Sequence, residues 1–142
     1  MLKARANLKK RNNDPYSDRE GLVYCRVSSK KQEIEGHGLE GQEERCKNDL
    51  KSIKVPYVKT FSDSYTGGGD FMNRPAMKAL IEYIDSRPHK KFVIVFDDLK
   101  RFARDVEFHI KLRACFRSRD VLLRCLNYNF DESPEGEFAE LI

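Results

Sequence analysis

The feature that most constrains the fold of this chain is the apolar run Phe92-Val-Ile-Val-Phe96. The run contains no polar residue and is followed at once by Asp97 and Asp98. A continuous run rich in β-branched residues is typical of a strand buried on both faces in the middle of a parallel sheet. We therefore expect an α/β fold organised around this strand.

The segments on either side alternate between strand and helix patterns. Strand patterns fall at 22–27, 57–61 and 121–126, and helix patterns at 39–53, 74–87 and about 105–118. Crossovers of this length predict a largely parallel sheet with helices on both faces. The expected fold is a flavodoxin-like three-layer sandwich.

Composition places this fold in one domain. A chain of 142 residues can bury a single core, and 39% hydrophobic with 35% charged residues describe a soluble globular protein. No run is long enough to cross a membrane, and the net charge of +4 permits an anionic partner without requiring one. Residues 1–20 are basic with few large apolar side chains, which predicts a disordered arm before a domain at 21–142.

The four cysteines are scattered along the chain. They form no Cys-x-x-Cys pair and have no histidine nearby at metal-ligand spacing, so the pattern argues against a zinc site. Reduced thiols of this kind indicate a cytoplasmic protein. The cysteines are Cys25, Cys46, Cys115 and Cys125.

Polar residues gather where three of the predicted strands end. Ser28 follows the first strand, a Gly-rich loop at 62–74 follows the second, and a charged segment at 97–105 follows the third. The carboxyl ends of parallel strands lie at one edge of a sheet, so we expect four arginines to surround the Ser28 hydroxyl. These are Arg26, Arg74, Arg101 and Arg104.

Such a cluster suits a phosphodiester substrate. Guanidinium groups hold the non-bridging oxygens of a phosphate and stabilise the extra charge of its five-coordinate transition state. They also favour ionisation of a serine, which is a weak nucleophile at its free pKa. The alternative reading of Arg26 and Ser28 is an ordinary strand end with two surface residues. The Gly-rich loop lacks Gly-Lys-Ser/Thr and is no nucleotide-binding P-loop.

Several ordered motifs resemble those of the serine recombinases (resolvases, invertases and large serine integrases), over residues 21–142. Tyr24-x-Arg26-Val27-Ser28-x-x-x-Gln32 is similar to the family's Y-x-R-V-S-x-x-x-Q, and Gly38-Leu39-x-x-Gln42 resembles the opening of its next helix. Phe61-x-Asp63-x-x-Thr66-Gly67, Phe71-x-x-Arg74-Pro75 and Arg101-Phe102-Ala103-Arg104-Asp105 resemble three further family motifs. The resemblance favours a resolvase-like domain, of the large-recombinase type.

The resemblance implies a role for each matched residue. Ser28 would attack the scissile phosphate and form a 5′-phosphoserine link to DNA. Arg26, Arg101 and Arg104 would clamp that phosphate, with Gln32 in support. Asp63 and Asp98 would orient the arginines or act as acid or base, and Arg74, Thr66 and Gln42 would bind the phosphate or help to orient the site. No metal, nucleotide or other cofactor is implied.

The resemblance also implies partners. The substrate would be double-stranded DNA in the cytoplasm, at the nucleoid, bound by a homodimer and recombined in a synaptic tetramer. A long helix would begin near Ser133 and is cut off by Ile142, so the chain reads as a truncated catalytic domain of a mobile-element recombinase.

Some readings stay open. Lys100 stands where many members of the family have an acid, and Asp98 matches only a variant motif, D-L-S-R. A catalytically inactive phosphate-binding or assembly module is therefore the rival to an enzyme. Asp63 and Thr66 could simply cap the Gly-rich loop, and Gln32 and Gln42 could be surface residues. Tyr24 and Phe102 are expected in the core.

Overall fold

The structure is a computed structural model that describes residues 14–27, 38–64, 74–98 and 106–129. The elements are β1 (Arg19–Val27), α3 (Leu39–Ser52), β2 (Tyr57–Ser64), α4 (Pro75–Asp85), β3 (Lys91–Phe96), α6 (Val106–Arg117) and β4 (Leu122–Cys125). Every strand and helix predicted between residues 22 and 126 is present, with boundaries shifted by a few residues.

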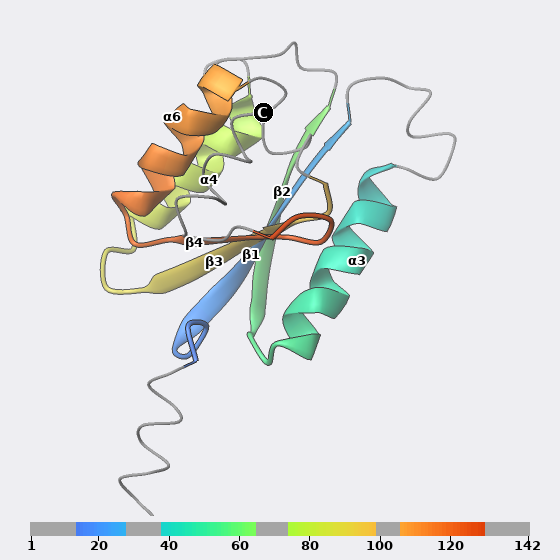
Figure 1. Ribbon diagram of the computed structural model, residues 1–142, viewed down its shortest axis with the longest axis horizontal. Helices are drawn as coiled ribbons and strands as arrows, with labels where there is room; N and C mark the ends of the chain where they lie inside the picture. The colour runs from blue at the N-terminus through green and yellow to red at the C-terminus, as the bar shows by residue number, and fades with distance from the viewer. Residues whose placement is uncertain (1–13, 28–37, 65–73, 99–105, 130–142) are drawn as a thin grey trace, which may run out of the picture.

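The four strands form one parallel sheet in the order β2-β1-β3-β4. Helix α3 lies on one face of this sheet, and α4 and α6 lie together on the other (Figure 1). The predicted three-layer α/β sandwich is therefore confirmed. No helix within the described ranges has the length and apolar character needed to cross a membrane.

Side chains along β1 alternate between two cores, as the pleat of a strand requires. Leu22 and Tyr24 belong to the core under α4 and α6, whereas Val23 and Cys25 belong to the core under α3. The same period places Arg26 on the α4 side, in line with Tyr24. Strand β3 is buried on both faces, as its continuous apolar run predicts.

The folded domain starts earlier than the sequence indicated. Residues 14–20 were expected in the disordered arm, but Asp14 to Asp18 form a turn and β1 already begins at Arg19. The reason is the buried Arg19 side chain, whose guanidinium donates to the carbonyl oxygens of Phe92 (3.0 Å) and Asp120 (2.7 Å). An arginine that appeared to belong to a basic tail thus fastens the first strand to the rest of the sheet.

Candidate active site at the carboxyl ends of β1 and β2

The described part of the site begins where β1 and β2 end side by side. Arg26 on β1 and Asp63 on β2 are direct partners in the register of these two strands. Both side chains are buried, with 3% and 2% of their surface exposed. A buried cation beside a buried carboxylate is unusual in a core, because each charge must recover the hydration that it loses.

Asp63 receives three hydrogen bonds from two different elements. Its Oδ1 accepts the backbone N–H of Ala76 (2.8 Å), and its Oδ2 accepts the N–H of Met77 (3.1 Å). These amides belong to the first turn of α4, where Pro75 has no N–H to offer and the N-cap residue Arg74 provides no side-chain cap. Asp63 therefore caps α4 from the neighbouring strand and fixes the point at which Arg74 enters the site.

The third bond to Asp63 comes from Tyr24, whose hydroxyl donates to Oδ2 at 2.7 Å. Burial raises the pKa of the Tyr24 phenol well above its usual range, and the positive charge of Arg74 lowers it in part. The charge and hydrogen bond of Asp63 raise this pKa further, and Arg26 lowers it. The phenol thus stays protonated and remains a hydrogen-bond donor.

Asp63 relates the two arginines to one another. Arg26 is its partner in the register of β1 and β2, and Arg74 is the N-cap residue of the helix that Asp63 caps. Arg74 is fully buried and is the largest fully buried side chain among the described residues. Two of the four arginines that the sequence predicts at the site are therefore buried at this end of the sheet.

Gln42 holds the backbone of Arg26 in place. Its Oε1 accepts the N–H of Arg26 and its Nε2 donates to the carbonyl oxygen of Arg26, both at 3.0 Å. The pairing of β1 with β3 ends at Val23, so a side-chain amide from α3 here does the work of a neighbouring strand. Gln42 is fully buried, and the alternative that it is a surface residue is wrong.

Asp98 lies at a different place at the same end of the sheet. It follows β3 and is half-buried, and its charge acts on the thiol of Cys125 on β4, as does that of Asp97. The carboxylate that bonds to the Tyr24 hydroxyl is that of Asp63.

The remaining predicted site residues lie outside the described residues. These are Ser28, Gln32, Thr66, Arg101 and Arg104, together with Lys100 and Phe102. Sequence reasoning placed Tyr24 in the core, which is correct, but missed its hydroxyl as the donor to Asp63. The available signal was its position two residues before Arg26, on the same face of the strand.

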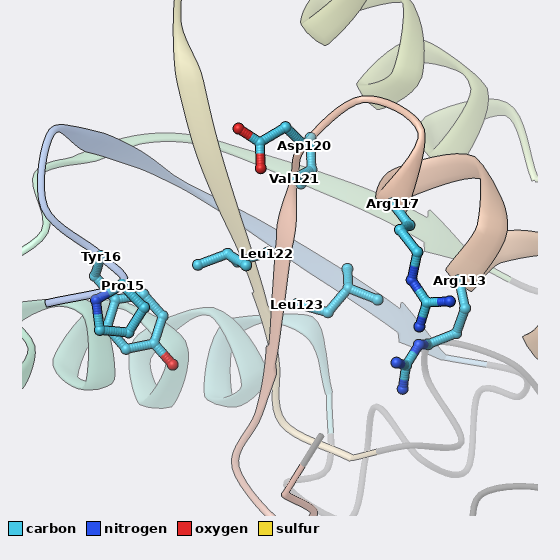
Figure 2. Close-up of a pocket in the computed structure, with 8 residues that line it drawn as sticks. All are labelled: Pro15, Tyr16, Arg113, Arg117, Asp120, Val121, Leu122 and Leu123. Carbon is cyan, nitrogen blue, oxygen red and sulfur yellow. The ribbon is translucent and has the colours of Figure 1, made fainter. Parts of the chain in front are cut away.

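The site is separate from a hollow at the edge of β4, which encloses about 320 Å³ (Figure 2). Arg113 and Arg117 line one side of this hollow and Pro15 and Tyr16 the other. The residues described above for the site do not line this hollow; they are Tyr24, Arg26, Gln42, Asp63 and Arg74. Within the described ranges, no group of three or more His, Cys, Asp or Glu side chains is arranged to hold a metal ion.

The sequence of the chain matches a known family over most of its length. The family described as Resolvase, N terminal domain, matches residues 21–142. The chain belongs to the resolvase family. A "Putative DNA recombinase" of Bacillus subtilis (strain 168) is 27% identical over 115 residues, which are 81% of this chain and 22% of the relative. This resolvase-family chain thus spans about a fifth of the length of that relative.

Solved structures share the fold of this resolvase-family domain. The N-terminal catalytic domain of TP901-1 integrase has a TM-score of 0.71 at 23% identity, covering 86% of this chain and 89% of that one. A resolvase family site-specific recombinase from Streptococcus pneumoniae has a TM-score of 0.68 at 22% identity, covering 86% and 83%. The C-terminal catalytic domain of ISC1926 TnpA, an IS607-like serine recombinase, has a TM-score of 0.62 at 18% identity, covering 86% of this chain and 77% of that one.

Proposed function

We propose that this chain is the catalytic domain of a site-specific serine recombinase, which cuts and rejoins double-stranded DNA. One observation carries the proposal. The buried Arg26, two residues before Ser28, is paired in register with Asp63, and Asp63 caps the helix whose N-cap residue is the buried Arg74. Guanidinium groups are the side chains that hold the non-bridging oxygens of a phosphate, and two buried ones at the end of a parallel sheet suit a phosphodiester substrate.

In the proposed reaction Ser28 Oγ forms a bond to the scissile phosphorus as the bond from phosphorus to the 3′ oxygen breaks. The serine gives up a proton, and the leaving 3′ oxygen takes one to become a hydroxyl. The 5′ phosphate is then an ester of Ser28. Because one phosphodiester replaces another, rejoining is the same step in reverse. Neither a metal ion nor a nucleotide enters this scheme.

The contacts of the described residues indicate which part of this reaction each of them would support. Arg26 would hold the phosphate close to the nucleophile Ser28, two residues further along the chain, and Gln42 would keep the backbone of Arg26 from shifting. Arg74 would reach the same phosphate from α4, whose first turn Asp63 fixes. With both carboxylate oxygens engaged by N–H and O–H donors, Asp63 is better suited to orient the site than to transfer protons.

The other roles remain as the family resemblance implies them. Arg101 and Arg104 would complete the phosphate clamp, Gln32 and Thr66 would support it, and Asp98 would orient it or transfer a proton. The proposed partners are double-stranded DNA at the nucleoid and further copies of the chain, as a dimer on DNA and a tetramer in synapsis. A catalytically inactive phosphate-binding module is the rival proposal.

The decisive experiment traps the covalent intermediate. The chain is incubated with nicked duplexes that have a degenerate centre, so that the severed strand diffuses away and the adduct persists. Trypsin cleaves after Arg26 and Lys30, so the adduct would be carried by the peptide Val-Ser-Ser-Lys, and fragmentation of this peptide distinguishes its two serines. We expect the nucleotide on Ser28.

The matched control is the neighbouring hydroxyl. The Ser28→Ala variant should form no adduct, whereas Ser29→Ala should form it as the unaltered chain does. An adduct that persists in Ser28→Ala would refute the proposal. Binding of DNA by the unaltered chain with no adduct would favour the rival module.

A further inference from the structure

A row of polar side chains on α3 connects this helix to three strands of the sheet. Gln42 bonds to the backbone of Arg26 on β1. Arg45 Nη2 lies 2.7 Å from Oδ2 of Asp97, at the end of β3. Further along the helix, Asp49 forms an ion pair with Arg124 on β4. Positions spaced by three and four residues lie on one face of a helix, so these contacts form a single row across β1, β3 and β4.

Two of these contacts lie at the carboxyl ends of the strands that lead into the proposed site. The residue held by Gln42 stands two positions before Ser28, and the residue held by Arg45 stands four positions before Arg101. Three residues of helix span about 4.5 Å and do not stretch. The pairing of β1 with β3 stops at Val23 and Val95, and beyond that point Gln42 and Arg45 bridge the two strand ends at a fixed spacing.

The Arg45–Asp97 pair should affect the reaction rate more than the stability of the fold, because one of its partners is exposed. The Arg45 side chain is 47% exposed, whereas that of Asp97 is 10% exposed. An ion pair with one partner so far in solvent contributes little to stability because water screens it. A shift of about 1 Å in a reacting group, by contrast, can slow a reaction about 100-fold.

We infer that Arg45, acting through Asp97, is a positioning residue that holds the end of β3, which Arg101 and Arg104 follow in the sequence, relative to the end of β1, which Ser28 follows. This role rests on the proposed function. Arg45 touches neither the phosphate nor the nucleophile in this assignment. It acts by holding the end of β3 at a fixed distance from the end of β1.

The test compares Arg45→Met with Arg124→Met in single-turnover adduct formation. Both substitutions remove an arginine that links α3 to a strand through an ion pair, but no predicted catalytic arginine follows β4. Arg45→Met should slow adduct formation at least tenfold and leave DNA affinity within twofold. Arg45→Lys should restore the rate to within threefold, and Arg124→Met should leave it unchanged. Equal rates for Arg45→Met and the unaltered chain, or equal slowing by Arg124→Met, would overturn the inference.

A second measurement does not depend on catalysis. Amide hydrogen exchange at Phe96 to Asp98 should become about threefold faster in Arg45→Met and stay unchanged in Arg124→Met. Failure of the unaltered chain to form an adduct would count against the proposed function, and the exchange rates would still decide the role of Arg45. No change in exchange at these residues would show that Arg45 does not hold the end of β3.

Discussion

The hydroxyl of Tyr24 lies 2.7 Å from Oδ2 of Asp63, across the boundary between the hydrophobic core and the candidate site. The Tyr24 ring packs in the core beneath α4 and α6, and its hydroxyl is the last polar group before Arg26 on that face of β1. Asp63 joins the hydroxyl to the first turn of α4. One carboxylate thus ties β1, β2 and α4 together.

Tyr24→Phe should destabilise the domain by about 1–3 kcal/mol, because it leaves a buried carboxylate oxygen with one donor fewer. Urea unfolding measures this difference. Tyr57→Phe is the control, since the Tyr57 side chain is exposed and its hydroxyl bonds to Thr60 and Glu43, and we expect its effect to stay within about 0.5 kcal/mol. Equal unfolding free energies for Tyr24→Phe and the unaltered protein would show that the bond contributes nothing.

Gln42→Leu should cost about 2–4 kcal/mol, because it leaves the buried N–H and C=O of Arg26 without the amide that now satisfies them. The same variant should slow adduct formation, since it releases the backbone of Arg26, two residues before Ser28. Asn48→Leu replaces an exposed amide on the same helix and should change stability by no more than about 0.5 kcal/mol. Gln42→Leu with unaltered stability would contradict the role given to this side chain.

The layers and the parallel direction of the strands follow from local pattern. Apolar runs such as that of β3, separated by helical periods, leave a parallel sheet as the solution, and this sheet is observed. The way a helix ends was less predictable than where it ends. The pattern predicts a helix to residue 53 and α3 ends at Ser52, but the chain leaves it through Lys54 at φ 60°, with Val55 N–H bonded back to Leu50. A lysine carries no local signal for this conformation.

The site was predictable as a set of residues but not as a set of contacts. The predicted strand ends and the family motifs indicated that Arg26, Asp63 and Arg74 belong to one site. That Asp63 would cap α4 and that Gln42 would hold a backbone depends on pairings over 13 and 16 residues. The pair formed by Arg45 and Asp97 spans 52 residues and has no sequence signature. Such partners are chosen by the packing of the helix on the sheet.

Stability should fall at alkaline pH through Cys125. Burial raises the pKa of this thiol to about 11, and the charges of Asp98 and Asp97 add to the shift. A group whose folded pKa is raised stabilises the fold fully below its unfolded pKa, near 9.0, and loses this contribution as pH rises through about 11. The unfolding free energy of Cys125→Ala, subtracted from that of the unaltered protein between pH 8 and pH 11, should therefore shrink with pH. A constant difference would contradict the assignment.

Gly21 should tolerate no larger residue, because α3 lies directly against it. A Cβ at this position would come within 2.6 Å of both Cδ atoms of Leu50, which is fully buried in the core beneath α3. Gly21→Ala should therefore cost about 1–3 kcal/mol through overpacking.

Leu50→Ala alone should cost about 2–5 kcal/mol, since it opens a cavity in a packed core. In the double variant the new methyl group occupies part of that cavity and meets no Cδ atom. Its loss of stability should accordingly be smaller than the sum of the two single losses, by about 1–2 kcal/mol, when the three variants are compared by urea unfolding. Losses that add to within about 0.5 kcal/mol would mean that the backbone of β1, and not the Leu50 side chain, sets the restriction at Gly21.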